Sequence, residues 1–197
     1  MRVAFVIAAM LALCQCATAP ERARPIVIVG VAEAPDQVAP TYTMLWRKVD
    51  VERGRFESHG GRRMIEFSTG GANTVRVEGL PGEFRVARVE PGLYALDGMY
   101  ATLREGAVRY TAQGSIIGPE RPAFEARPGE VIYLGIWQAS LDNELAVVRP
   151  WRLASEDARA VAREAGINGA VVLRETHAYA VPCAPRRMHP SLAREIC

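Results

Sequence analysis

The stretch Arg127-Pro-Gly-Glu-Val-Ile-Tyr-Leu-Gly-Ile-Trp137 sets the organisation of the whole chain. It opens on a Pro-Gly pair, and no charged residue occurs from Val131 to Trp137. Side chains alternate between the two faces of a β-strand. One face of this stretch carries Val131, Tyr133, Gly135 and Trp137, and the other carries Ile132, Leu134 and Ile136. Both faces are apolar, so we predict a central strand that is covered on both sides.

Pro-Gly pairs precede three strand candidates, at 81–82, 91–92 and 128–129. Proline presets φ for the first central position of a type II turn, and glycine supplies the positive φ of the second. We interpret each pair as a turn that launches a strand of an antiparallel sheet. Further strands are predicted from β-branched or alternating patterns at 25–31, 41–51, 64–67, 74–78, 99–103, 108–112, 123–126, 144–148 and 169–174.

One helix is predicted, at 155–165. Ser155 is the expected N-cap, and Gly166 is placed to end the helix. A stripe of small apolar residues recurs at helical spacing, formed by Ala158, Val161, Ala162 and Ala165. We expect this stripe to cover one face of 131–137 while an opposing sheet covers the other. Gly135 lacks a side chain and should allow a close approach.

Many short strands and one late helix predict a mainly β protein, an antiparallel β-sandwich with one C-terminal α-helix packed on it and a Pro-rich C-terminal tail. Two motifs, Pro-Gly-Leu-Tyr-Ala-Leu at 91–96 and Phe124-x-Ala-x-Pro-Gly-Glu-x-x-Tyr-x-Gly135, add a resemblance. Residues 74–174 resemble small proteobacterial envelope proteins and lipoproteins with a transthyretin-like or carboxypeptidase-regulatory-like sandwich. The resemblance implies a sandwich fold and an envelope setting, and it carries over no catalytic residue.

The N-terminus has the pattern of an export signal. Arg2 is the only charged residue before Glu21, and an apolar run extends from Val3 to Leu13. A basic start, a short apolar run and small residues are typical of a secretory signal peptide, and the run is shorter than the ~20 residues that span a bilayer. We predict a lipobox-like signal peptide at 1–16, a tether at 17–24, the sandwich domain at 25–181 and a tail at 182–197.

Two ways of processing this signal remain open. Cys16 and Cys14 each follow a leucine by three residues, as in the lipobox of bacterial lipoproteins, although Gln15 or Leu13 stands where a small residue is usual. Ala17-Thr-Ala19 instead fits cleavage and release into the periplasm. We favour lipidation at Cys16, which would give an outer membrane lipoprotein facing the periplasm, because its acyl chains are enough for stable anchoring.

Cys183 and Cys197 are the cysteines that follow the signal region. Two cysteines left over in an oxidising compartment usually pair, so we predict a disulfide between them. The loop of 15 residues that it closes would contribute roughly 3 kcal/mol by restricting the unfolded chain. The disulfide would also hold the Pro-rich tail at 182–197, which otherwise should fray.

Catalytic motifs are missing from the sequence. The three histidines, His59, His177 and His189, form no His-Glu-x-x-His pair, and there is no Gly-x-Ser-x-Gly elbow. Ser58 precedes His59, but adjacency in sequence does not make a catalytic triad. No metal site is predicted, because zinc clusters usually show closer cysteine pairs. We therefore predict a non-enzymatic protein without a cofactor.

Two groups of residues are candidates for ligand contact. The first is basic and could meet lipid phosphates or anionic glycans; it comprises Arg53, Arg55, Arg62 and Arg63. Glutamates interleave with it, which favours a hairpin tip in solvent. The second is aromatic and could line a ligand groove, although aromatic residues at strand spacing more often form a core; it comprises Tyr94, Tyr100, Tyr110, Tyr133 and Trp137.

Export, a sandwich and no catalytic motif favour a non-enzymatic envelope protein, tethered by an N-terminal lipid, that acts as a binding or structural module for another envelope protein or polymer. The formal net charge of +2 is close to neutral, so no nucleic-acid partner is expected. One alternative is a periplasmic metal-binding protein or hydrolase that uses His177 and His189 with Glu195. Another is an accessory subunit of a surface or secretion complex.

Overall fold

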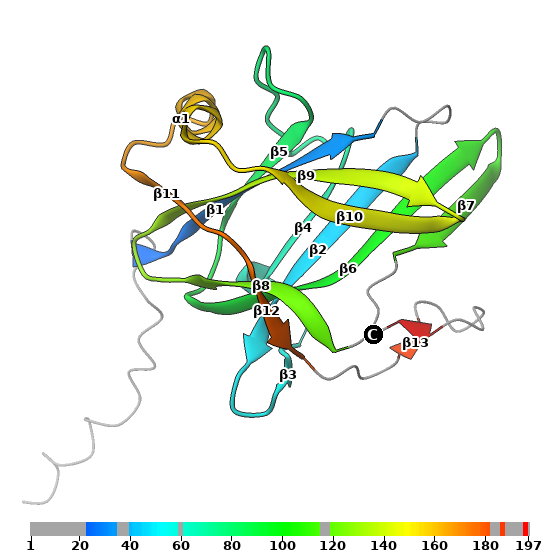
Figure 1. The fold of residues 1–197 in the computed structure, drawn as a ribbon, viewed down its shortest axis with the longest axis horizontal. Helices are drawn as coiled ribbons and strands as arrows, with labels where there is room; N and C mark the ends of the chain where they lie inside the picture. The colour runs from blue at the N-terminus through cyan, green and yellow to red at the C-terminus, as the bar shows by residue number, and fades with distance from the viewer. Residues whose placement is uncertain are drawn as a thin grey trace, which may run out of the picture.

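The computed structural model describes residues 23–34, 40–58, 61–114, 119–181, 186–187 and 195–196. In chain order its elements are β1 (Ile26–Glu33), β2 (Thr41–Asp50), β3 (Arg55–Phe56), the 3-10 helix η2 (Gly61–Arg63), β4 (Met64–Ser68), β5 (Glu83–Arg88), β6 (Gly92–Glu105), β7 (Val108–Gln113), β8 (Glu120–Ala126), β9 (Val131–Asp142), β10 (Leu145–Arg152), α1 (Ser155–Glu164), β11 (Val171–Leu173), β12 (His177–Ala180), β13 (Arg186–Arg187) and β14 (Glu195–Ile196). They form the predicted mainly β sandwich with a single α-helix among the described residues (Figure 1).

Two sheets make the sandwich. The first has the strand order β10-β9-β1-β5, with β11 also paired to β9, and the second has the order β12-β8-β6-β2-β3, with β4 on β2 and β7 on β6. Most neighbours are antiparallel, as predicted, but β9 runs parallel to both β1 and β11. Strands β1 and β9 are separated in the sequence by strands of the second sheet, so no hairpin connects them and no antiparallel pairing is imposed.

The predicted central strand is confirmed as β9. Its neighbour on one side is β1, and on the other side β11 pairs with its first residues and β10 with its later ones. One face packs against the second sheet and the other lies beneath α1, so both faces are covered. Figure 1 shows α1 beside β11 and above the first sheet.

The strict alternation expected along β9 is wrong beyond Gly135. The register of β9 with β1 shifts across Gly135, where β9 carries an extra residue, and Gly135 has φ +82°. The register with β10 shifts just after it, between Ile136 and Trp137. A β-bulge of this kind inserts one residue without a partner and reverses the alternation that follows. Trp137 therefore faces the second sheet, and Ile136 lies in the cluster beneath α1. The close approach expected at Gly135 is confirmed, because the carbonyl oxygen of Arg152 stands against it.

Aromatic residues fill the space between the two sheets. The ring of Trp46 on β2 meets Trp137 edge-on with centroids 5.3 Å apart, and Phe124 on β8 at 5.5 Å. Tyr94 stacks on Phe124 at 5.6 Å. All four side chains are almost fully buried. Such contacts add to the large apolar area that these side chains remove from water, so this cluster anchors the two layers.

The helix forms where it was predicted, but its N-cap differs from the prediction while its C-terminal glycine agrees with it. Ala154 occupies the N-cap position and makes no side-chain hydrogen bond, so the assignment of Ser155 as N-cap is wrong by one residue. Gly166 does end the helix, with φ +65°. Its N–H donates to the carbonyl of Arg163, and the N–H of Ile167 donates to Ala162. This is the Schellman arrangement that a glycine at this position permits.

Local turn chemistry accounts for other details. The N–H of Glu130 donates to the carbonyl of Arg127 at 3.2 Å, and Gly129 has φ +76°, as predicted for the Pro-Gly turn before β9. The strand predicted at 74–78 is wrong, because this segment contributes only an isolated bridge between Val75 and Phe84. The two strands predicted around 92–103 are one continuous strand, β6.

Candidate functional site

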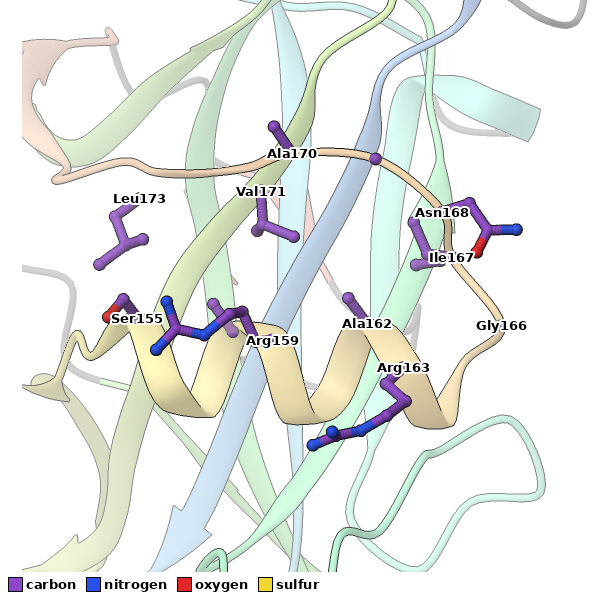
Figure 2. Close-up of a pocket in the computed structure, with 12 residues that line it drawn as sticks. Ser155, Arg159, Ala162, Arg163, Gly166, Ile167, Asn168, Ala170, Val171 and Leu173 are labelled. Carbon is purple, nitrogen blue, oxygen red and sulfur yellow. The ribbon is translucent and has the colours of Figure 1, made fainter.

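A groove of about 430 Å³ lies between α1 and the returning segment 166–173. Small apolar residues of the helix, Ala158 and Ala162, line one wall, and Val171 and Leu173 line the other. Figure 2 shows Val171 pointing toward the helix and Ala162 pointing toward the returning segment. The predicted small-residue stripe therefore has two roles, since it packs on the first sheet and also leaves room beside the helix.

Ion pairs fix the two walls. Arg152, just before α1, lies 2.6 Å from the buried carboxylate of Asp157 and 3.6 Å from Glu156. On the opposite wall, Nη2 of Arg174 donates to both carboxylate oxygens of Glu130, at 3.0 and 2.9 Å. The second pair joins the end of β11 to the turn that precedes β9. Each wall thus includes an ion pair in which at least one carboxylate is buried or partly buried.

Two arginines of α1 stand at the mouth of the groove. Arg159 and Arg163 are both exposed, and neither forms an ion pair within the described part of the chain. Figure 2 shows Arg159 lying over the first turn of the helix near Ser155, and Arg163 extending along the outer side of the helix. Like charges four residues apart on a helix repel each other weakly, so an anion near this pair would be stabilised.

The far wall of the groove is also the edge of a sheet. β11 pairs with β9 and with no other strand described here. Val172 and Leu173 keep 39% and 38% of their surface exposed. The groove therefore combines an apolar wall, an unpaired strand edge and two cations, which together suit an extended anionic ligand.

Beneath the helix lies a buried hydroxyl with no evident chemical role. Tyr133 is fully buried, and its hydroxyl has no hydrogen-bond partner among the described residues. Burial raises the pKa of this hydroxyl, and the nearby Asp157 carboxylate raises it further. A phenol that stays protonated and enclosed is unsuited to act as a general base. We assign Tyr133 to the core.

A second group of charges is buried inside the second sheet. Nη1 of Arg47 donates to Oδ2 of Asp97 at 2.8 Å, and the guanidinium of Arg47 lies 5.0 Å from the Phe56 ring. Arg121 lies 5.6 Å from the same ring and donates through Nη1 to the carbonyls of Leu96 and Asp97. Burial lowers the pKa of Arg121, and Asp97 opposes this shift. The group is enclosed, so it acts on stability rather than as an exposed site.

The four arginines proposed for anionic surfaces lie near one hairpin tip. Arg53 and Arg55 belong to the β2–β3 hairpin, while Arg62 and Arg63 lie in η2. Arg53 is 3.1 Å from Asp50, and Arg63 is within 3.5 Å of the carboxylates of Glu57 and Glu90. All four are exposed. Carboxylates on the protein thus engage part of this patch, and its role in binding stays a prediction.

The histidine and cysteine predictions fall mostly beyond the described residues. His177 is exposed on β12, in register with Ala123 of β8. His59, His189, Cys14, Cys16, Cys183 and Cys197 lie outside the described residues. Between the last two cysteines, Arg186 pairs with Ile196 and Arg187 with Glu195. No cluster of three potential metal ligands occurs in the part of the chain that the structure covers.

The aromatic residues are mainly core. Tyr94, Tyr133 and Trp137 are buried, whereas Tyr110 keeps 52% of its surface exposed. The hydroxyl of Tyr100 donates to Glu66 at 3.4 Å. None of the five lines the groove beside α1, so the idea of an aromatic-lined ligand groove has no support at this site.

Sequence reasoning missed the groove itself. A signal was present, since Arg159 and Arg163 are four residues apart and adjoin the Ala158 and Ala162 stripe. Helical spacing places such residues on neighbouring parts of one surface. That the segment after Gly166 folds back along the helix could not be read from spacing. It follows from the pairing of β11 with β9.

Comparisons with protein-family models, curated proteins and solved structures gave no match for this chain. In the regions with assigned structure, no helix is both long and apolar enough to cross a membrane.

Proposed function

We propose that this protein is an exported, non-enzymatic envelope module that is anchored through Cys16 and binds another envelope component in the groove between α1 and β11. The groove carries the proposal, because it joins an apolar wall to the unpaired cations Arg159 and Arg163. The signal-like residues 1–16 support export, and their cysteines support a lipid anchor. We further propose that Cys183 and Cys197 form a disulfide in the oxidising envelope.

The start of the domain bears on how the groove would be presented. The N–H of Gly129 donates to the carbonyl of Ala23 at 2.7 Å, so the tether leaves the domain at the turn before β9. Glu130 of the same turn holds Arg174 at the end of β11. A tether over 17–24 spans at most about 28 Å when fully extended. A protein anchored at Cys16 would therefore hold the turn before β9 within that reach of the membrane, where other envelope proteins lie.

The test uses the full chain with a C-terminal tag in living cells. A photo-crosslinking amino acid replaces Ser155, an exposed residue at the groove. In a control strain it replaces Arg104, which is exposed on the β6–β7 hairpin. We expect a discrete envelope adduct from position 155 that disappears when Arg159→Glu and Arg163→Glu are introduced, and no such adduct from position 104.

Anchoring is measured in the same cells. Wild-type protein should fractionate with the outer membrane, and Cys16→Ser should release it into the soluble fraction or leave its signal uncleaved. Membrane association that is unchanged in Cys16→Ser would contradict the lipid anchor. Adducts that are the same from both crosslinking positions, or that persist in the Arg159→Glu and Arg163→Glu variant, would contradict the groove as the binding site.

A further inference from the structure

We infer that the groove takes an extended acidic peptide segment of a partner protein, which pairs with the free edge of β11 as an additional strand. This inference rests on the proposed function, because it names the ligand class of the same groove. It goes further by assigning the backbone of β11, and not only the side chains around it, to recognition.

Hydrogen bonding decides which backbone groups of β11 are free. The N–H of Arg174 donates to the carbonyl of Tyr133 on β9 at 3.0 Å. In a parallel pair, a residue whose backbone N–H and C=O point toward the partner strand alternates with a residue whose N–H and C=O point away from it. Val172 therefore also directs its N–H and C=O to β9, in agreement with its register opposite Ile132. Val171 and Leu173 direct theirs outward, where no other strand of the described chain pairs with them.

An open edge of this kind is a template for a further strand. Main-chain hydrogen bonds supply affinity in strand addition, and side-chain pockets supply specificity. Val171 and Leu173 both line the groove, so alternate residues of an added strand would face α1. Those residues would meet Ser155 and the head group of Arg159, which are exposed on the helix side of the groove. The other residues would lie on the same side as the exposed Val172.

Charge selects an acidic segment. The acidic residues of the first turn of α1, Glu156 and Asp157, pair with Arg152, while Arg159 and Arg163 have no carboxylate partner among the described residues. A glutamate facing α1 could pack its methylene groups on Leu173 and extend its carboxylate to an arginine. Arginine suits this contact because its planar donors match a carboxylate.

A peptide fits these observations better than a lipid surface does. Phosphate head groups need positive charge, and they make no use of the outward N–H and C=O groups of Val171 and Leu173. The arginines also flank a concave wall rather than a flat patch. A membrane surface therefore explains the cations and leaves the strand edge and the groove without a role.

The test measures binding of labelled acetyl-Val-Glu-Val-Glu-Val-Glu-amide by fluorescence anisotropy. The protein used is the chain from residue 17 onward. It is exported to the periplasm so that Cys183 and Cys197 meet the oxidising conditions in which their disulfide is proposed to form. We expect saturable binding that weakens with salt, because exposed ion pairs are screened. The probe with lysine in place of glutamate should bind at least about tenfold more weakly.

Paired variants locate the site. Arg159→Glu with Arg163→Glu should reduce affinity for the acidic probe at least about tenfold and favour the lysine probe. Arg104→Glu with Arg109→Glu changes the total charge equally on the exposed β6–β7 hairpin, where the two residues are cross-strand partners. This control should change affinity less than about threefold. Equal losses from both double variants would overturn the site.

Two measurements isolate strand addition. Leu173→Pro removes an outward N–H and leaves the β9-facing groups of Val172 and Arg174 unchanged, so it should weaken binding about tenfold. Because this variant also needs to fold, a probe N-methylated at alternate residues removes donors from the ligand instead. Of the two methylation patterns, one should abolish binding and the other should be tolerated. Two patterns that are tolerated equally would overturn strand addition.

The outcomes separate this inference from the proposed function. Binding to phosphatidylglycerol vesicles that exceeds binding to the acidic probe, and is lost in the Arg159→Glu and Arg163→Glu variant, would replace the peptide with a membrane surface. A crosslink from Ser155 in cells, together with no probe binding, would retain the groove as a binding site and overturn the acidic strand. Probe binding without any crosslink in cells would support the ligand class and contradict the envelope function.

Discussion

The carbonyl oxygen of Arg152 occupies the place where a side chain at position 135 would begin, since a Cβ on Gly135 would lie 2.5 Å from it. Gly135 also has φ +82°. Here β9 changes partner from β11 to β10, and the bulge allows that exchange. Gly135 thus lets the end of β10, which leads into α1, pack directly against β9.

Gly135→Ala should destabilise the protein by about 2–4 kcal/mol, because it adds a clash with backbone to a strained φ. Gly98→Ala is the matched control, since a Cβ there meets no atom within 4 Å and φ is not in the left-handed region. Its effect should stay within about 1 kcal/mol. Urea unfolding of both variants measures the difference, and equal free energies of unfolding would contradict the role of Gly135.

Asp97→Asn should cost about 3–5 kcal/mol, because it leaves Arg47, whose side chain is only 6% exposed, without its counter-charge. Glu125→Gln removes a pair of similar length, 2.9 Å to Arg127, at a site where both side chains are more than half exposed. That control should cost less than about 1 kcal/mol. Thermal or urea unfolding compares the two, and a cost for Asp97→Asn as small as the control's would contradict a buried ion pair.

Glu83 should make stability depend on pH. Burial acts to raise the pKa of this carboxyl, but hydrogen bonds from Arg76 and from the Gly70 N–H outweigh it, so the pKa lies below its usual 4.5. A carboxyl whose pKa is lowered by folding stabilises the protein at pH values above its unfolded-state pKa. This stabilisation is lost as the pH falls through the folded-state pKa. Glu83→Gln should therefore cost about 1–3 kcal/mol at neutral pH and progressively less below about pH 4.5.

Urea unfolding of wild type and Glu83→Gln at several pH values checks this window. Arg76→Gln keeps the carboxylate and removes its guanidinium donors, which raises the folded-state pKa of Glu83 toward the unfolded-state value. This variant should therefore lose less stability than wild type as the pH falls below about 4.5. A difference between wild type and Glu83→Gln that stays constant from neutral pH to pH values well below 4.5 would contradict the assignment.

The predicted disulfide between Cys183 and Cys197 can be measured directly. Intact mass of protein purified from the periplasm should show no free thiol at either residue until a reductant is added. Cys183→Ser should lower the free energy of unfolding by about 2–4 kcal/mol if the loop constrains the unfolded chain. Alkylation of both cysteines in exported, unreduced protein would show that the bond does not form.

Local patterns were enough for most of the scaffold. The Pro-Gly turn before Val131 and the glycine that ends α1 were predicted because each depends on φ at one or two residues. The segment 74–78 alternates like a strand but forms a single bridge, because alternation describes the side chains and does not supply a neighbouring strand to pair with. The exchange of faces at Trp137 also escaped prediction, since a bulge depends on two partner strands.

The sequence by itself determined that Val131–Trp137 is a strand covered on both sides, because apolar residues on both faces must leave water. It also determined that one helix packs on that strand through a stripe of small apolar residues. Only the tertiary structure decided that β11 returns beside β9, that its outer edge has no partner strand among the described residues, and that Arg159 and Arg163 line the groove beside it. These features depend on contacts between residues distant in sequence, and no local spacing encodes them.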